Sequence, residues 1–277
     1  MRKLFRSTVL AAVAAGVSLA PVVAAADVAP SALPPVMAKV TQAGVTVVKE
    51  FKAIGGLNGW LMMHGSQPAI AYTTPDGKAL LFGALVNDQG QNMTAAYMGR
   101  YVPKPKLNKL IPELEKSAYV TVGNPDSKHM IYAFVDPNCI FCHLTNIELT
   151  PYIKAGLQVR LVMVGFLKPD SAAKAAAILE AKNPAKAWAT NEKGFNETAE
   201  EGGITGIPHP SAKTVAALQA NMALMQKFGF NGTPGIVYQQ NGKWQTINGM
   251  PQEAQLPAMT GLPAQAETNP QLARFQQ

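Results

Sequence analysis

Two cysteines, separated by two residues, are the side chains of this sequence best suited to chemistry. Cys139 and Cys142 are the only cysteines among 277 residues, so cysteine does not cross-link distant parts of the fold. An isolated C-x-x-C pair fits either a redox-active dithiol or a site where a cofactor is attached or ligated. The sequence from Asp136 to His143 reads D-P-N-C-I-F-C-H. The secondary structure predicted around the two cysteines distinguishes between these alternatives.

The pair follows a predicted buried strand and opens a predicted helix. Residues 130–135 are continuously apolar, which is typical of a buried strand, and residues 139–154 show helical spacing. Cys139 then lies at the helix start, where unpaired N–H groups and the helix dipole stabilise a thiolate. Cys142 lies one turn further on, at a separation that a disulfide can span. We therefore expect Cys139 to be the attacking thiolate and Cys142 to be a buried resolving thiol.

Two other kinds of site could use the same residues. Cys139 to His143 matches C-x-x-C-H, the attachment sequence of a c-type haem, and two thiolates with a histidine suit a soft metal ion. A haem would need a second axial ligand and largely helical surroundings, whereas this motif directly follows a predicted β-strand. None of the four histidines repeats the spacing that a metal site would need. We therefore favour the redox dithiol and expect neither a cofactor nor a metal.

The first 26 residues have the order of a secretory signal peptide. Basic residues at positions 2, 3 and 6 precede an apolar run from Ser7 to Ala20, and small residues end at Ala26. The apolar run is shorter than the roughly 20 residues that a membrane span needs. We expect cleavage after Ala26, export to an oxidising compartment and no membrane helix in the mature protein.

The charge of the mature chain is modest. Removal of the three basic residues of the signal peptide lowers the formal charge from +7 to +4. The remaining basic residues are scattered, apart from Lys104, Lys106 and Lys109 among prolines. Such a pattern is typical of a solvated segment, so we expect no nucleic-acid partner.

The mature chain divides into two predicted domains. A helix near residues 36–43 and strands within residues 45–86, with a turn at Thr74–Gly77, predict a small antiparallel sheet. Prolines and lysines then predict a linker, and a strand–helix–strand pattern surrounds the cysteines. The predicted parts are a signal peptide at 1–26, an N-terminal domain at 27–100, a linker at 101–122, and a domain at 123–277 with a helical insertion at about 168–230.

Several of these features together resemble one known family. D-P-x-C-x-x-C-H after a strand, a preceding sheet domain, a helical insertion and Gly232-Thr233-Pro234 are similar to the DsbC/DsbG thiol:disulfide interchange proteins of the bacterial periplasm. The resemblance covers essentially the whole mature chain, and Asp76 to Thr94 looks like the family's dimerisation domain. A single cysteine pair fits DsbG better than DsbC, which usually carries a second, structural pair. Ile140 departs from the proline or glycine of many members, so the redox potential cannot be taken from the family.

The resemblance implies a fold and a set of site residues. The fold is an α+β N-terminal cystatin-like dimerisation domain followed by an α/β thioredoxin fold with a helical insertion. Cys139 and Cys142 are then catalytic. A cis-proline loop at Thr233–Pro234 lies against them, where its backbone can pair with an extended substrate. The remaining motif residues Ile140, Phe141 and His143 support the pair, and we expect His143 to help stabilise the thiolate.

The resemblance also implies a function and partners. The protein would be a periplasmic disulfide isomerase or reductase, with sulfenic-acid reductase and chaperone activity as further roles. Its partners would be a second copy of itself, misoxidised or unfolded exported proteins, and a membrane reductase of the DsbD type. Two alternatives remain open, namely a dithiol oxidase of the DsbA type, for which an N-terminal domain would be unnecessary, and a holdase chaperone without redox chemistry.

Overall fold

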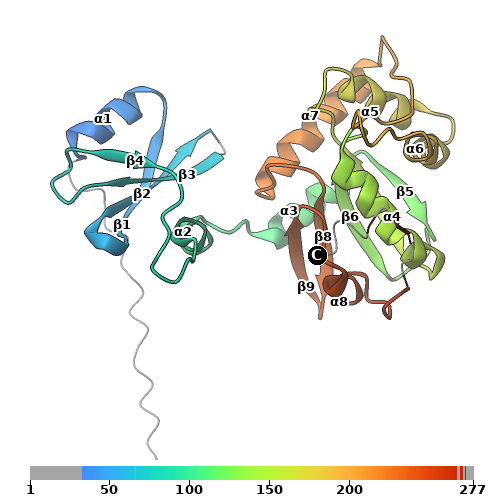
Figure 1. Ribbon diagram of the computed structural model, residues 1–277. Coiled ribbons are helices and arrows are strands. Elements are labelled where there is room, and N and C mark those ends of the chain that lie inside the picture. Colours follow the sequence, from blue (N-terminus) through green and yellow to red (C-terminus); the bar gives the residue numbers. More distant parts are fainter. Residues whose placement is uncertain (1–32, 66, 267–268, 271, 273–277) are drawn as a thin grey trace, which may run out of the picture. The chain divides into compact units, whose positions relative to one another are not determined.

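The computed structural model describes residues 33–65, 67–266, 269–270 and 272. The predicted signal peptide at 1–26 lies outside the described residues. The chain forms two compact units, with Ala69–Ala96 in the first and the chain from Tyr97 in the second (Figure 1). Across the described residues, no helix combines the length and the apolar character needed to span a membrane.

The first unit is a small sheet with a helix. Met37 of the helix is fully buried and packs with Trp60, Met62 and Ala71 of the sheet. The turn predicted at Thr74–Gly77 is present, because the Gly77 N–H donates to Thr74 O at 2.9 Å and the Asp76 carboxylate accepts the Thr74 hydroxyl at 2.6 Å. The elements are α1 (Pro35–Gln42), β1 (Thr46–Lys52), η1 (Ile54–Gly56), β2 (Asn58–His64), β3 (Gln67–Thr73) and β4 (Leu80–Phe82), with the strands in the order β1-β2-β3-β4, and then α2 (Met93–Tyr101).

The sequence predicts a linker at 101–122, but this range contains regular structure. It holds α3 (Leu107–Leu114) and most of β5 (Tyr119–Gly123). Ile111 and Leu114 of α3 are buried in a cluster with Phe134, and all three residues belong to the second unit. Lys109 and Pro112 lie on the exposed side of this short amphipathic helix, opposite its buried apolar face.

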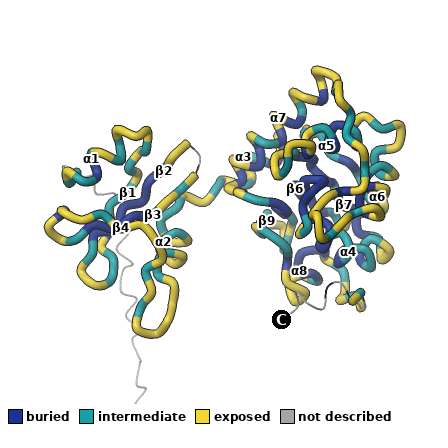
Figure 2. Tube along the Cα trace, turned by 45° about the horizontal axis from the view of Figure 1, so that its top comes forward, coloured by how far each residue is buried: buried dark blue, intermediate teal, exposed yellow. Residues whose placement is uncertain are grey.

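The second unit is a five-stranded sheet in the order β5-β7-β6-β8-β9. The β6–β7 pair is parallel, and the β5–β7, β6–β8 and β8–β9 pairs are antiparallel. The central strand β6 is almost completely buried (Figure 2). The further elements are β6 (Met130–Val135), α4 (Ile140–Lys154), β7 (Gln158–Met163), α5 (Ser171–Glu180), α6 (Pro184–Lys193), α7 (Ala212–Lys227), β8 (Gly235–Gln240), β9 (Lys243–Asn248), η2 (Glu253–Gln255) and α8 (Leu256–Thr260).

Two apolar clusters cover the two faces of this sheet. On one face, residues of alternate strand positions such as Ala133 and Leu161 pack with α4, α5, α6 and α8. On the other, Tyr132 and Val162 pack with α3 and the C-terminal part of α7. The expected α/β architecture with additional helices is therefore present.

Local features of the sequence also account for the last elements. Asn183 and Ser211 cap α6 and α7 by accepting N–H groups three residues further on. The β8–β9 hairpin turns at Asn241 and Gly242, which have φ of +50° and +73°. Such positive φ values are the reason for the Asn-Gly pair at this turn.

Candidate active site

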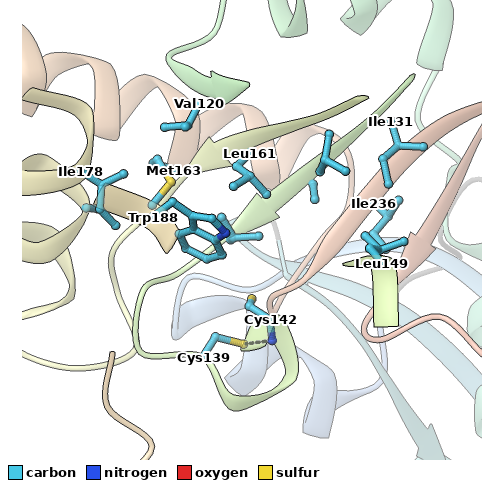
Figure 3. Close-up of a cluster of buried hydrophobic side chains, with 14 of the residues drawn as sticks. Val120, Ile131, Cys139, Cys142, Leu149, Leu161, Met163, Ile178, Trp188 and Ile236 are labelled. Atoms are coloured by element: carbon cyan, nitrogen blue, oxygen red, sulfur yellow. Dashed lines mark hydrogen bonds between the residues drawn. The ribbon is translucent and has the colours of Figure 1, made fainter. Parts of the chain in front are cut away.

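The two cysteines lie where β6 leads into α4, as expected. Cys139 is the N-cap residue of α4, and its Sγ accepts the Cys142 backbone N–H at 3.2 Å (Figure 3). Both cysteines are free thiols, and they are only 3% and 2% exposed. Figure 3 shows them beside the apolar cluster that contains Trp188 and Leu161. The reactive sulfur is therefore embedded at a helix start.

A second segment meets Cys139 from far along the chain. The Thr233–Pro234 peptide bond is cis, as predicted. The Cys139 thiol donates to the backbone oxygen of Thr233 at 3.3 Å. Strand pairing explains this contact, because Gly235 lies opposite Phe134 in the β8–β6 register. The Thr233–Pro234 loop enters β8 at the edge of the sheet where β6 ends.

The environments of the two thiols push their pKa values apart. A hydrogen bond from the Cys142 thiol lowers the pKa of Cys139, against the opposing effect of burial, and the Thr233 hydroxyl and the Cys142 backbone N–H add to the lowering. Burial raises the pKa of Cys142 well above its usual value, and the adjacent Cys139 sulfur raises it further. Among the residues that the structure describes, the Thr233 hydroxyl is buried without a hydrogen-bond partner while Cys139 is a thiol, so it is available to the thiolate. The arrangement favours ionisation of Cys139 before Cys142.

A buried carboxylate, which the sequence analysis did not identify, holds the turn before Cys139. Asp136 is fully buried. Its Oδ1 accepts the Asn138 N–H at 2.9 Å and the Ser171 hydroxyl at 2.8 Å. Its Oδ2 accepts the backbone N–H groups of Phe166 and Leu167 at 2.8 and 3.0 Å. One side chain thus connects the cysteine turn to the segment after β7 and to the start of α5.

Asn138 extends this polar network toward the helical insertion. Its Oδ1 accepts the Lys174 ammonium at 2.9 Å and the Gly202 N–H at 3.0 Å. Its Nδ2 donates to Asp170 at 2.8 Å, and Asp170 pairs with Lys174 at 2.9 Å. A Cβ on Gly202 would lie 2.3 Å from Pro137 O, so the close approach requires glycine. The helical insertion therefore fixes the turn that carries Cys139.

His143 does not take the role that we expected for it. Its Nδ1 lies 2.9 Å from Glu192 Oε2, and its ring stacks on Phe195 with centroids 4.4 Å apart. The groups that lower the pKa of Cys139 are instead those of Cys142 and Thr233. Of the two residues between the cysteines, Ile140 is partly buried and Phe141 is 47% exposed.

The structure brings most of the predicted site residues together. Cys139, Cys142 and Thr233–Pro234 form one cluster, with Phe141 at its surface and His143 turned to α6. Within the described part of the chain, no three His, Cys, Asp or Glu side chains gather so that they could hold a metal ion. The arrangement can perform thiol–disulfide exchange, because an activated thiol and a second thiol lie on one helical turn.

Comparisons with known proteins point in the same direction. Residues 116–260 match the model of a thioredoxin-like domain. The chain is 34% identical over 235 residues to the thiol:disulfide interchange protein DsbG of Pseudomonas aeruginosa, covering 83% of this chain and 89% of that protein. It is 32% identical over 256 residues to DsbG of Escherichia coli, covering 91% and 94%. It is also 27% identical to DsbC of Dickeya dadantii, covering 66% and 68%.

Proposed function

The chain belongs to the DsbG family of thiol:disulfide interchange proteins, and from this premise we propose that Cys139 and Cys142 are the pair that reduces and rearranges wrong disulfides in exported proteins. The protein is a thiol:disulfide oxidoreductase with a thioredoxin-like domain. Its substrates would be misoxidised proteins in the periplasm, where the predicted signal peptide at 1–26 would deliver it.

Cys139 starts the reaction. Its thiolate attacks one sulfur of a substrate disulfide, the substrate S–S bond breaks, and the second substrate sulfur leaves as a thiolate that takes up a proton. The Cys142 N–H at 3.2 Å and the donors that lower the pKa of Cys139 favour the attacking form. The substrate is then joined to Cys139 by a mixed disulfide, and its backbone can pair with the Thr233 peptide group.

Cys142 completes the reaction. Once Cys139 is in the mixed disulfide it no longer carries the negative charge that raises the pKa of Cys142. Cys142 can then lose its proton and attack Cys139 Sγ, which releases the substrate sulfur as a thiol. Two electrons pass to the substrate, and Cys139 and Cys142 are left as a disulfide. If another substrate thiol attacks the mixed disulfide first, the result is isomerisation.

The observation that carries this assignment is the place of Cys139 at the N-cap of α4, where its Sγ accepts the Cys142 N–H at 3.2 Å. The opposite directions of the two pKa shifts agree with it. We expect Cys139→Ser to abolish exchange. Cys142→Ser should instead accumulate mixed disulfides with substrates, because the resolving attack is lost. Non-reducing electrophoresis after acid quenching measures the trapped complexes. Trapping by the Cys139 variant and not by the Cys142 variant would reverse the assignment.

The direction of electron flow distinguishes a reductase from a DsbA-type oxidase. The similarity to DsbG and DsbC favours the isomerase or reductase. We expect the pair to be kept reduced in cells by a membrane reductase of the DsbD type. Thiol trapping in cells should therefore find Cys139 and Cys142 mostly as thiols, and a mostly oxidised pair would favour the oxidase.

We also propose that the protein is a homodimer through its N-terminal domain, at residues 27–100. β4 is a three-residue edge strand, and Leu81, Phe82 and Val86 in and beyond it are 46%, 65% and 52% exposed. Exposed apolar side chains beside a sheet edge favour self-association. Such a dimer could also bind unfolded chains as a chaperone.

Sedimentation tests the dimer. The mature protein should sediment as a dimer, and Phe82→Glu should shift it to the monomer because a charge would be buried in the contact. Val215→Glu is the control, since Val215 on α7 is also exposed, at 39%, but lies in the second unit. A monomeric parent protein would refute the proposal.

A further inference from the structure

Two consecutive residues of α6, Asn191 and Glu192, contact the cysteine motif on both of its sides. Asn191 Nδ2 donates to the backbone oxygen of Pro137, two residues before the first cysteine, at 3.0 Å. Glu192 Oε2 lies 2.9 Å from Nδ1 of His143, the residue after the second cysteine. We call Asn191 and Glu192 the α6 clamp. It holds both ends of the segment 137–143, which contains the two thiols.

The α6 clamp is buried and its members are joined to each other. Asn191 is fully buried and Glu192 is only 8% exposed. The Asn191 amide also donates to Glu192 Oε1 at 3.0 Å. The backbone oxygen of Asn191 accepts the Gly203 N–H at 2.9 Å, and the space beside Asn191 Oδ1 leaves no room for a Cβ on Gly202. Buried polar groups with satisfied partners are rigid, so the clamp ties the motif to α6.

His143 carries this constraint to the first turn of α4. Its side chain is confined between Glu192 and the ring of Phe195, and it is 7% exposed. Its backbone N–H donates to the backbone oxygen of Cys139 at 3.0 Å. The turn that holds Cys139 and Cys142 therefore cannot move independently of the α6 clamp.

Stabilising the contact between α6 and α4 does not require polar residues. A buried carboxylate contributes little net stability, because the cost of removing it from water offsets its attraction to a partner. Apolar side chains of similar size would hold the two helices together equally well. Hydrogen-bonded polar groups differ from apolar ones because they specify one arrangement. A polar clamp on both sides of two reactive thiols indicates that the arrangement of the thiols matters.

The resolving step is the part of the reaction that depends on this arrangement. Cys142 attacks Cys139 Sγ of the mixed disulfide, a new S–S bond of about 2.05 Å forms, and the substrate sulfur leaves as a thiolate that takes up a proton. Such an attack is fast when the reacting atoms are held about 3–3.5 Å apart, and a displacement of about 1 Å can lower its rate about a hundredfold. In the dithiol, Cys139 Sγ already accepts the Cys142 N–H at 3.2 Å.

We propose that Asn191 and Glu192 are positioning residues that keep Cys142 in place to attack Cys139. The inference rests on the proposed exchange reaction and goes beyond it, because it makes α6 control the fate of the mixed disulfide. A well-placed Cys142 releases the substrate quickly in its reduced form, whereas a displaced Cys142 leaves time for another substrate thiol to attack. The α6 clamp also favours the Cys139–Cys142 disulfide over two thiols, because it holds the sulfurs together before the bond forms.

Asn191→Ala and Glu192→Ala test the proposal in the full mature protein. Each should lower the equilibrium constant for oxidation of the dithiol by oxidised glutathione about two- to tenfold, which corresponds to one hydrogen bond of ordinary net strength. Alkylation of the remaining thiols at equilibrium, followed by electrophoresis, measures this constant. In a single turnover with a disulfide peptide, the mixed disulfide should persist about two- to tenfold longer in both variants, as measured after acid quenching.

Glu192→Gln is the conservative variant that should restore both properties. Its amide oxygen can accept the Asn191 amide, and its NH₂ group can donate to Nδ1 of a neutral His143, so both contacts of the carboxylate are kept. We expect an equilibrium constant and a mixed-disulfide lifetime close to those of the parent protein. If Asn191→Ala does not fold, the comparison of Glu192→Ala with Glu192→Gln decides the proposal.

Asn221→Ala is the matched control for Asn191→Ala. Asn221 on α7 is 1% exposed, and its Nδ2 donates to the backbone oxygens of Ala118 and Met163, both at 2.8 Å. The control removes comparable buried hydrogen bonds without touching the segment 137–143. It should lose stability and keep the equilibrium constant and the mixed-disulfide lifetime of the parent protein.

Three results would overturn the inference. The clamp variants could keep the parent equilibrium constant and mixed-disulfide lifetime, Asn221→Ala could change both as much as Asn191→Ala does, or the equilibrium constant could rise in the clamp variants. Failure of the parent protein to form a mixed disulfide with the peptide would instead refute the proposed function itself.

Discussion

The turn before Cys139 and the Thr233–Pro234 loop approach the same sulfur from two strands, β6 and β8. Buried polar side chains hold the turn, with Asp136 accepting four hydrogen bonds. The loop approaches through the Thr233 backbone oxygen and the Thr233 hydroxyl, which has no hydrogen-bond partner in the described part of the chain while Cys139 is a thiol. The turn therefore fixes the position of Cys139, whereas the Thr233 hydroxyl of the loop can donate a hydrogen bond once the Cys139 sulfur is charged.

The largest effect should come from breaking the turn. Asp136→Ala would leave the Asn138 N–H, the Ser171 hydroxyl and two backbone N–H groups without their acceptor. A buried donor left without its acceptor costs about 1–3 kcal/mol, so we expect the free energy of unfolding to fall by about 3 kcal/mol or more. Urea denaturation of the reduced mature protein measures it.

Asp126→Ala is the matched control for this prediction. Asp126 is exposed on the segment before β6, and surface substitutions are usually within about 0.5 kcal/mol. If both variants lost the same stability, or if neither did, the turn would not depend on the Asp136 carboxylate.

The same contrast shows what could be predicted from the sequence. Cys139 at a helix start and the Thr74–Gly77 turn depend on neighbours within a few residues, so local patterns identified them. Thr233–Pro234 was found through a family motif, since only the β6–β8 pairing brings it to Cys139.

The polar network and the direction of His143 could not be predicted. Apart from their contact with each other, the partners of Asp136 and Asn138 lie about thirty or more residues away, at the start of α5, before it and beyond α6. His143 was expected near the thiolate because it follows Cys142, yet Glu192 on α6 holds it. The D-P-N sequence before Cys139 was the available signal, because a polar side chain between a buried strand and a helix needs a buried partner.

A smaller effect should come from the second cysteine. The Cys142 thiol is the main group that lowers the pKa of Cys139, so Cys142→Ala should raise that pKa. In the Cys142→Ala variant the alkylation rate of Cys139 should therefore increase at a higher pH than in the parent protein, and at neutral pH it should be lower than in the parent protein. Cys142→Ser keeps a hydrogen-bond donor and should retain part of the lowering. Identical pH profiles for the alanine and serine variants would contradict a hydrogen-bonding role.

The smallest effect should come from the loop, and it should appear in reactivity rather than in stability. Thr233→Val removes a buried hydroxyl that lacks a partner in the thiol form, so the free energy of unfolding at neutral pH should change by less than about 1 kcal/mol. The hydroxyl lowers the pKa of Cys139, so its loss raises that pKa and moves the alkylation profile to higher pH. A hydrogen bond of about 0.5–1.5 kcal/mol corresponds to an alkylation rate about two- to tenfold lower below the midpoint. Thr260→Val is the control, because Thr260 is also buried but its hydroxyl donates to Leu256 O at 2.7 Å. It should lose stability and leave the alkylation profile unchanged. If Thr233→Val instead destabilised the protein without moving the profile, the loop would hold Cys139 in place as the turn does, and the contrast between the two segments would fail.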